Sequence, residues 1–232
     1  MKLSVLIPVY NEEMMIGELI ERVARVDMGK IEMEIIVAND GSTDASAQII
    51  EAHRALHADL IRAYSMPINL GKGAAIRLGL HYAQGDVILV QDADLELDPN
   101  EYGNLLQPII EGKTNVVYGS RFLNARKRGI PLRTRLANRF LTTLTNVLFD
   151  TRLTDMETAY KVFRREVLQG VRLRCVHFDF EPEITGQLAK RGHRIVEVPI
   201  SYSPRRADEG KKVSWVDGIE AIYTLLRVRF AS

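Results

Sequence analysis

Short apolar runs alternate with longer segments of helical periodicity through the first half of the chain. The runs predict buried strands at five places: Leu3 to Val9, Glu34 to Ala38, Leu60 to Tyr64, Asp86 to Val90 and Asn115 to Tyr118. The segments between them predict four helices: Glu13 to Val26, Asp44 to His57, Lys72 to Ala83 and Asn100 to Glu111. This alternation indicates an α/β fold with a mostly parallel central sheet and helices on both faces. Residues that follow the carboxyl ends of the strands are therefore the first candidates for a binding site.

The second half is less regular but shows no break in composition. It predicts two helices and two strands: a helix from Arg133 to Leu148, a strand from Tyr160 to Phe163, a helix from Glu181 to Lys190 and a strand from Arg194 to Ser201. Residues 203–213 are polar and predict a mobile loop. A final helix begins near Ser214. Four large apolar residues share one of its faces: Trp215, Ile219, Ile222 and Leu226. We interpret residues 1–232 as a single domain.

Composition and charge narrow the class of protein. The chain has 232 residues, of which 46% are hydrophobic, enough for one domain with a large core, and its net charge of +1 does not suggest a nucleic-acid partner. Cys175 is the single cysteine; it excludes an internal disulfide, and with no His or Cys cluster nearby it argues against a zinc site and favours a reducing, cytoplasmic compartment. No apolar run approaches the roughly 18 residues of a membrane span, and the first strand starts too early for a cleavable leader. We expect a soluble or peripheral protein.

Polar motifs follow three of the predicted strands. In Asn39-Asp40-Gly41-Ser42-Thr43-Asp44, Asp40 could accept a hydrogen bond from a nucleobase while Gly41 lets the backbone approach a ligand. The glycines and lysine of Asn69-Leu70-Gly71-Lys72-Gly73, at a helix N-terminus, suit a diphosphate, although the spacing is not that of a Walker loop. Pro8-Val9-Tyr10-Asn11-Glu12 places a ring and a carboxylate where the sheet opens. Each motif alone is also explained as a helix cap or a turn.

The motif Gln91-Asp92-Ala93-Asp94-Leu95-Glu96 is more specific, because an apolar strand delivers it to the sheet edge. In an extended chain, side chains two residues apart point the same way, so Asp92, Asp94 and Glu96 can face one site. Three carboxylates would repel each other without a cation, and hard oxygen ligands suit Mg²⁺ or Mn²⁺. The sequence predicts a metal site here.

Together with Gly119-Ser120-Arg121, these motifs occur in the order and spacing of the inverting family 2 glycosyltransferases. The chain most resembles the catalytic domain of dolichyl-phosphate mannose and glucose synthases and their bacterial relatives. The resemblance implies a GT-A fold, a UDP- or GDP-sugar donor and a divalent metal, with residues 1–118 as the nucleotide-sugar and metal half and 119–232 as the acceptor half. The family commonly has Asp-Asp where this chain has Asn39-Asp40.

The resemblance also implies roles for individual residues. Donor contacts are assigned to Pro8, Tyr10, Glu12, Asp40, Lys72, Asp92 and Ala93. Metal ligands are assigned to Asp92, Asp94 and Glu96. Contacts to an acceptor phosphate or to the donor diphosphate are assigned to Arg121, Arg135, Arg206 and Lys212. Catalytic roles fall to Asp94, Arg121 and Asp155.

The favoured acceptor is a polyprenyl phosphate at the cytoplasmic membrane face, which needs orientation and charge compensation more than deprotonation. The alternative acceptor is a saccharide or protein hydroxyl; Asp155 or Glu157 would then be the base, unless these acids pair with a neighbouring Arg152 or Lys161. The segment from Tyr223 to Phe230 could dock on a membrane or on a membrane partner subunit, but it also fits an ordinary packed helix.

Two other classes remain as alternatives. A nucleotidyltransferase also uses paired acids and a metal, but it usually has an early loop rich in glycine and arginine, which is missing between Pro8 and Met15. A non-catalytic nucleotide-sugar sensor or partner subunit is disfavoured, because the metal acids and the basic residues are all present.

Overall fold

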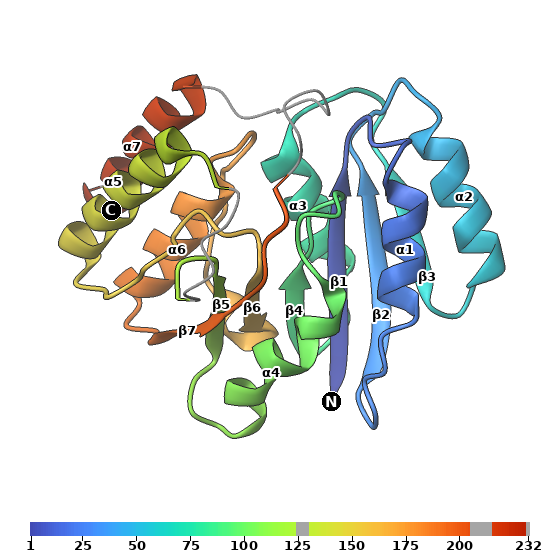
Figure 1. The fold of residues 1–232 in the computed structure, drawn as a ribbon, viewed down its shortest axis with the longest axis horizontal. Coiled ribbons are helices and arrows are strands. Elements are labelled where there is room, and N and C mark those ends of the chain that lie inside the picture. The colour runs from blue at the N-terminus through green and yellow to red at the C-terminus, as the bar shows by residue number, and fades with distance from the viewer. Residues whose placement is uncertain (124–129, 205–214, 231–232) are drawn as a thin grey trace.

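The computed structural model describes residues 1–123, 130–204 and 215–230. Within these residues a seven-stranded sheet has the order β3-β2-β1-β4-β6-β5-β7 (Figure 1). The strands are β1 (Lys2–Val9), β2 (Glu32–Asn39), β3 (Ile61–Ser65), β4 (Val87–Val90), β5 (Val116–Ser120), β6 (Lys161–Arg164) and β7 (Ile195–Pro199). All seven correspond to predicted strands within about two residues at each end.

The sheet is parallel except for β6, which runs antiparallel to both β4 and β5. The sequence predicts a strand at this position but not its direction. The chain leaves β5, forms the long helix α5 (Leu132–Phe149) and returns along residues 150–160, so that β6 starts at the edge where β4 and β5 end. Residues 154–160 are thereby delivered to the same edge as the loops that follow the parallel strands.

Helices cover both faces of the sheet, as predicted. One face packs against α1 (Ile16–Ala24), α2 (Ser46–Leu56) and α4 (Tyr102–Ile110). The other packs against α3 (Lys72–Tyr82), α5, α6 (Phe180–Lys190) and α7 (Trp215–Phe230). Two short 3-10 turns, η1 (Pro99–Glu101) and η2 (Arg165–Leu168), complete the described elements. The α/β fold with a mostly parallel sheet is thus confirmed.

Two helices differ in detail from the expectation. α1 begins at Ile16, three residues later than Glu13, because Asn11 takes a left-handed conformation with φ 50° and residues 12–15 form a turn. α7 buries another face than its largest apolar residues suggested. Its core contacts come from Ala221, Thr224, Leu225 and Val228, whereas Trp215, Ile219 and Leu226 are exposed.

Among the described residues, no helix combines the length and the apolar character that crossing a membrane requires.

Candidate active site

The loops after β1 and β2 interlock at the carboxyl edge of the sheet. The Asn11 backbone N–H donates to Ser42 Oγ at 3.0 Å, and the Thr43 N–H donates to Asn11 Oδ1 at 2.8 Å. A second reciprocal pair joins Glu13 and the start of α2, where the Ala45 N–H donates to the Glu13 carboxylate at 2.8 Å. The caps proposed as the simple explanation are made partly within one loop, where Asp44 Oδ1 accepts the Ser46 N–H at 3.0 Å, and partly between the two loops. These contacts fix the segment that contains Tyr10 and Glu12.

Asp40 holds the next loop in place. Its buried carboxylate accepts hydrogen bonds from the Leu70 N–H at 2.8 Å and the Gly71 N–H at 2.7 Å, and from Asn69 Nδ2 at 2.9 Å. Gly41 permits this approach, because a Cβ there would lie 2.4 Å from the carbonyl carbon of Ile68. The loop of Leu70 and Gly71 was predicted to bind a diphosphate, but the backbone N–H groups of these two residues donate to Asp40 instead. The contact of Asp40 with a nucleobase stays a prediction.

Lys72 lies between two carboxylates from different halves of the chain. Its ammonium is 2.7 Å from Asp92 Oδ1 and 2.8 Å from Glu181 Oε1 at the start of α6. Burial by itself would lower the pKa of Lys72, but the two carboxylates outweigh it and raise the pKa above its ordinary value. Lys72 therefore stays charged and compensates part of the negative charge of the loop that contains Asp92, Asp94 and Glu96, which we call the acidic loop. The contribution of Glu181 was not predicted.

Gln91 anchors the acidic loop to the core. Its side-chain oxygen accepts hydrogen bonds from the Tyr102 and Tyr160 hydroxyls, both at 2.8 Å, and its Nε2 donates to the Asp92 carbonyl at 3.0 Å. Gln91 is fully buried. Two core tyrosines from α4 and the start of β6 thus fix the backbone that carries the aspartates, which a sequence motif alone does not reveal.

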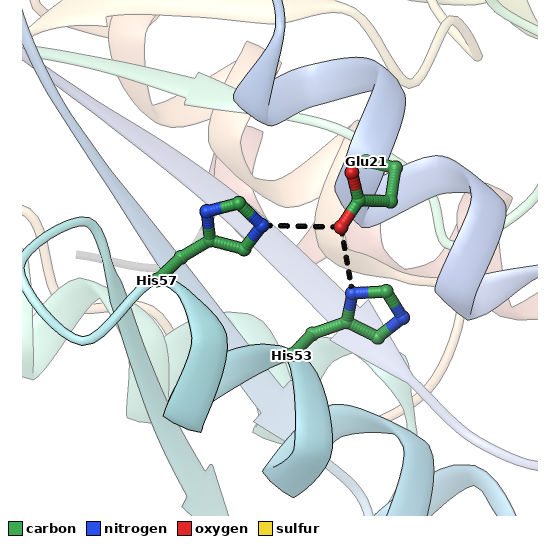
Figure 2. A group of neighbouring side chains, drawn as sticks. All are labelled: Glu21, His53 and His57. Carbon is green, nitrogen blue, oxygen red and sulfur yellow. Dashed lines mark hydrogen bonds and ion pairs between the residues drawn. The ribbon is translucent and has the colours of Figure 1, made fainter.

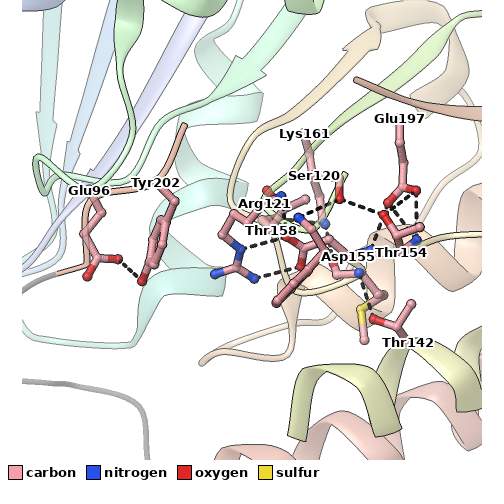
Figure 3. Close-up of polar contacts among 12 residues, drawn as sticks. Glu96, Ser120, Arg121, Thr142, Thr154, Asp155, Thr158, Lys161, Glu197 and Tyr202 are labelled. Atoms are coloured by element: carbon pink, nitrogen blue, oxygen red, sulfur yellow. Dashed lines mark hydrogen bonds and ion pairs between the residues drawn. The ribbon is translucent and has the colours of Figure 1, made fainter. Parts of the chain in front are cut away.

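The remaining acids of the loop face the segment after β7. The Glu96 N–H donates to Asp94 Oδ1 at 3.1 Å, so Asp94 shapes the turn that presents it. The Glu96 carboxylate accepts a hydrogen bond from the Tyr202 hydroxyl at 2.9 Å (Figure 3). The Glu96 carbonyl accepts another from the Ser203 N–H. The predicted third metal ligand therefore also holds residues 202–203 at the site.

Arg121 forms a bidentate ion pair with Asp155 beside this loop (Figure 3). Arg121 Nε and Nη2 donate to the two carboxylate oxygens at 2.7 and 2.8 Å, and the Arg121 backbone N–H adds a third bond at 3.0 Å. Burial lowers the pKa of Arg121, but the Asp155 carboxylate raises it by more, so the guanidinium keeps its charge. The Arg121 guanidinium also lies 5.3 Å from the centre of the Tyr202 ring.

Glu197 positions the loop that carries Asp155. Its carboxylate accepts hydrogen bonds from the Thr154 N–H and hydroxyl and from the Asp155 N–H, all between 2.8 and 3.0 Å. Asp155 therefore has its backbone fixed by β7 and its side chain occupied by Arg121. The suggested pairing with Arg152 or Lys161 is therefore wrong for Asp155, whereas Glu157 does interact electrostatically with Lys161.

Glu157, which is partly buried, and Lys161, which is fully buried, form a second group of interacting charges beside the first. Burial raises the pKa of Glu157, and the neighbouring Glu181 adds to this effect. Burial lowers the pKa of Lys161, whose ammonium donates to the carbonyls of Met156 and Thr158. Glu157 Oε1 is buried without a hydrogen-bond partner among the described residues. A raised carboxyl pKa is what a general base near neutral pH needs, so Glu157 fits the hydroxyl-acceptor alternative better than Asp155 does.

Not every predicted site residue is brought to this cluster. Pro8 does not end the strand as expected but lies inside β1, in register with Ala38, and Ala93 is buried beside the aspartates. Arg135 is half-buried in the first turn of α5, and no contact between described residues joins its side chain to Arg121 or Asp155. Arg206 and Lys212 lie outside the described residues, as does most of the predicted 203–213 loop. The roles assigned to these residues stay predictions.

Comparison with known proteins places this arrangement in a family. Residues 4–172 match the model of the family described as Glycosyl transferase family 2, and the chain belongs to this family. It is a glycosyltransferase with a GT-A fold, as the motifs and the sheet indicated.

Curated relatives match over most of the chain. It is 28% identical over 219 residues to the glycosyltransferase AglD of Haloferax volcanii, covering 88% of this chain and 33% of that protein. It is 28% identical to the undecaprenyl-phosphate 4-deoxy-4-formamido-L-arabinose transferase of Proteus mirabilis, over 97% of this chain and 67% of the relative. The Edwardsiella ictaluri protein of the same name is 30% identical, over 90% and 62%. The chain thus spans one third to two thirds of the length of these relatives.

Solved structures share the fold. The glucosyl-3-phosphoglycerate synthase of Mycobacterium tuberculosis, crystallised with Mn²⁺, UDP and phosphoglyceric acid, superposes with a TM-score of 0.76 at 21% identity, covering 100% of this chain and 79% of that one. The same enzyme with Mg²⁺ and UDP gives a TM-score of 0.72, also at 21% identity, over 98% and 79%. At this identity the likeness shows the fold and not the substrates.

Proposed function

We propose that this chain transfers a hexose from a UDP- or GDP-sugar to a polyprenyl phosphate, with Mg²⁺ or Mn²⁺ at the acidic loop and with inversion at the anomeric carbon. The observation that carries the proposal is the position of the charged groups. The acidic loop of Asp92 and Asp94 and the Arg121–Asp155 pair lie at one edge of the sheet, bridged by Tyr202. Two of the curated relatives are named as undecaprenyl-phosphate transferases, which supports the same acceptor class here.

The residues of the acidic loop fit a divalent metal. Asp92 and Asp94 offer carboxylate oxygens, which Mg²⁺ and Mn²⁺ prefer, and Gln91 fixes the backbone that carries them. Glu96 can contribute while its other oxygen holds Tyr202. When bound, such a metal supplies Lewis-acid stabilisation of the departing nucleotide diphosphate.

Arg121 is the group suited to an anionic acceptor. The acceptor phosphate oxygen attacks the anomeric carbon, a new carbon–oxygen bond forms, and the bond to the diphosphate breaks with its electron pair on the nucleotide. A phosphate oxygen is already ionised at neutral pH, so this step needs no base. Arg121 contributes a fixed positive charge and free donor positions, because Asp155 occupies only one edge of its guanidinium. In this scheme Asp155 is a positioning residue.

Transfer to lipid is the direct test. Purified protein with Mn²⁺ is first screened by thermal shift against UDP- and GDP-sugars, and the stabilising donor is then supplied in labelled form with polyprenyl phosphate. We expect label in the lipid fraction and a product of opposite anomeric configuration by NMR. The matched control is the unphosphorylated polyprenol, which has the same chain without the phosphate and should stay unlabelled. Labelling of soluble saccharides alone would instead support the hydroxyl acceptor.

A lipid acceptor requires access to a membrane, and two neighbouring helices carry features suited to it. α5 and α7 pack against each other on the same side of the sheet (Figure 1). Large apolar residues are exposed at helical spacing on both: Leu132, Leu136 and Phe140 on α5, and Trp215, Ile219 and Tyr223 on α7. α5 also contains three arginines and no acidic residue, and α7 has Arg227 and Arg229 in its last turn. We propose that this surface docks on an anionic bilayer.

Vesicle co-sedimentation tests this docking surface. The protein should sediment with vesicles that contain phosphatidylglycerol and much less with pure phosphatidylcholine, and high salt should weaken binding. Replacing Leu136 and Phe140 by glutamate should reduce binding at least about fivefold, because the change removes apolar area and adds negative charge. The control is Ile110→Glu, an exposed apolar residue at the end of α4 on the opposite face. Equal loss in both variants, or no loss in either, contradicts the assignment.

A further inference from the structure

Two histidines and a glutamate meet between α1 and α2, on the side of the sheet that carries these helices (Figure 2). Glu21 lies on α1, His53 on α2, and His57 directly after α2. Glu21 Oε1 accepts a hydrogen bond from His53 Nδ1 at 3.0 Å and another from His57 Nε2 at 3.1 Å. One carboxylate oxygen is therefore shared by two imidazoles that stand four residues apart.

The spacing of the three atoms matches metal coordination. One ring nitrogen of His53, one of His57 and a Glu21 carboxylate oxygen all lie within 4.8 Å of one another. In a tetrahedral zinc site the bond lengths of about 2.0–2.1 Å place ligand atoms about 3.4 Å apart. A metal between the three atoms therefore needs the two hydrogen-bonded pairs to move apart by a few tenths of an ångström and the two ring nitrogens to lie about 3.4 Å from each other. The proton on each coordinating nitrogen would move to the other nitrogen of its ring.

The surroundings keep the three groups in place. His57 is fixed at the backbone, because its N–H donates to the His53 carbonyl and its own carbonyl accepts from Leu60 and Ile61. The second oxygen of Glu21 pairs with Arg25 at 3.2 Å, which leaves Oε1 for the histidines. Gly17 makes room for the His53 ring, since a Cβ there would lie 3.1 Å from His53 Nε2. All three side chains are partly buried, with 18 to 32% of their surface exposed.

We propose that Glu21, His53 and His57 bind a zinc-class cation, with a water molecule in the fourth position. Two imidazole nitrogens and one carboxylate oxygen form a borderline set that suits Zn²⁺, Co²⁺ or Ni²⁺, unlike the all-oxygen acidic loop, which suits Mg²⁺ or Mn²⁺. Zinc was not expected from the sequence because no His or Cys cluster lies near Cys175, whereas His53 and His57 form such a cluster elsewhere in the chain. The histidine spacing is visible in the sequence, but Glu21 comes from another helix and joins only through the fold.

The position suggests a structural clamp. α1 and α2 begin at the interlocked loops of Asn11 and Thr43, and the metal site joins the opposite ends of the same two helices. Bound zinc would hold the helix pair together from the far end and stabilise the folded chain by mass action. This role does not depend on the sugar donor or the acceptor.

Calorimetric titration of Zn²⁺ into the full chain tests the site, with saturating Mg²⁺ and UDP present to occupy the acidic loop. The variants His57→Gln and Glu21→Gln keep a polar side chain between the helices but remove one ligand or its charge. Each should weaken this zinc site at least about tenfold and abolish the zinc-dependent rise in Tm, with the metal-free Tm and far-UV CD showing that the fold persists. The control is His81→Gln, an exposed histidine in the last turn of α3, which should bind zinc as the unchanged chain does.

Co²⁺ gives an independent readout, because its visible spectrum reports coordination geometry and nitrogen ligands. The unchanged chain should show four-coordinate bands that His57→Gln lacks. If the variants bind Zn²⁺ and Co²⁺ as the unchanged chain does, the proposal is overturned. It is also overturned if the variants lower the metal-free Tm while zinc never raises that of the unchanged chain, since the three residues would then form a hydrogen-bonded link only.

Discussion

Replacing Asp94 with asparagine is expected to lower kcat by at least about a hundredfold, the loss typical of removing one charged group that stabilises a transition state. Asparagine keeps the size of the side chain and an oxygen that can accept the Glu96 N–H, so the turn should survive the change. What is lost is the negative charge. Steady-state kinetics with a fixed donor and acceptor, together with calorimetric titration of Mn²⁺, would measure both consequences.

A matched control lies four residues further along the same loop. Asp98 is exposed and caps the turn η1, where its carboxylate accepts the Asn100 N–H at 3.0 Å. Asp98→Asn retains this cap and should leave kcat and Mn²⁺ binding within about twofold of the unchanged chain. If Asp94→Asn transfers the sugar at the same rate as this control, the assignment of Asp94 as a metal ligand is contradicted.

Removal of Arg121 is expected to affect both activity and stability. Arg121→Ala leaves the buried carboxylate of Asp155 without its partner, which costs about 3–5 kcal/mol of the free energy of unfolding. It also removes the fixed positive charge proposed for the acceptor phosphate, so kcat/KM for a polyprenyl phosphate should fall at least about a hundredfold. Denaturant unfolding and single-turnover assays would separate the two losses.

The double variant Arg121→Met with Asp155→Leu distinguishes structure from chemistry. Replacing both partners of a buried ion pair with apolar residues is often close to neutral for stability, so the fold should largely recover while the activity does not. Asp155→Asn adds a second criterion. If Asp155 positions Arg121, this variant lowers kcat without changing its pH dependence; loss of the acidic limb of the pH profile would instead show that Asp155 acts as a base. Recovery of full activity in the double variant contradicts a role for Arg121.

The local pattern of hydrophobic residues is enough to predict most of the fold, because buried strands such as β1 and β4 are continuous apolar runs. The direction of β6 cannot be predicted in this way, since a strand of only four residues, Lys161 to Arg164, shows no local feature that depends on its direction. The buried face of α7 cannot be predicted from the local hydrophobic pattern either, for another reason. Small residues such as Ala221 let the helix approach its neighbours, while its largest apolar residue, Trp215, stays outside.

The candidate site likewise contains some residues that the local sequence predicts and some contacts that it does not. The acids of the strand-end loop are predictable, because they follow one apolar strand and are adjacent in sequence. The ion pair of Arg121 with Asp155 joins positions 34 residues apart, and that of Lys72 with Glu181 joins positions 109 apart. The sequence around each residue does not indicate its partner, so these ion pairs can be predicted only when the order of the strands in the sheet is known. Lys72 was assigned to the donor on its glycine-rich loop, and its link to α6 comes from the fold.

Because β6 is antiparallel, the acidic loop and the residues around Arg121 are carried by different kinds of chain segment. The loops after β1, β2 and β4 are exits from parallel strands, whereas residues 154–160 are the entrance to a strand that runs the other way. Insertions or exchanges in residues 154–160 therefore change the neighbourhood of Arg121 without lengthening any loop that carries the acidic motif. If the proposed roles of the two groups hold, such a topology allows acceptor preference to diverge among descendants of one gene while the handling of the nucleotide is inherited unchanged.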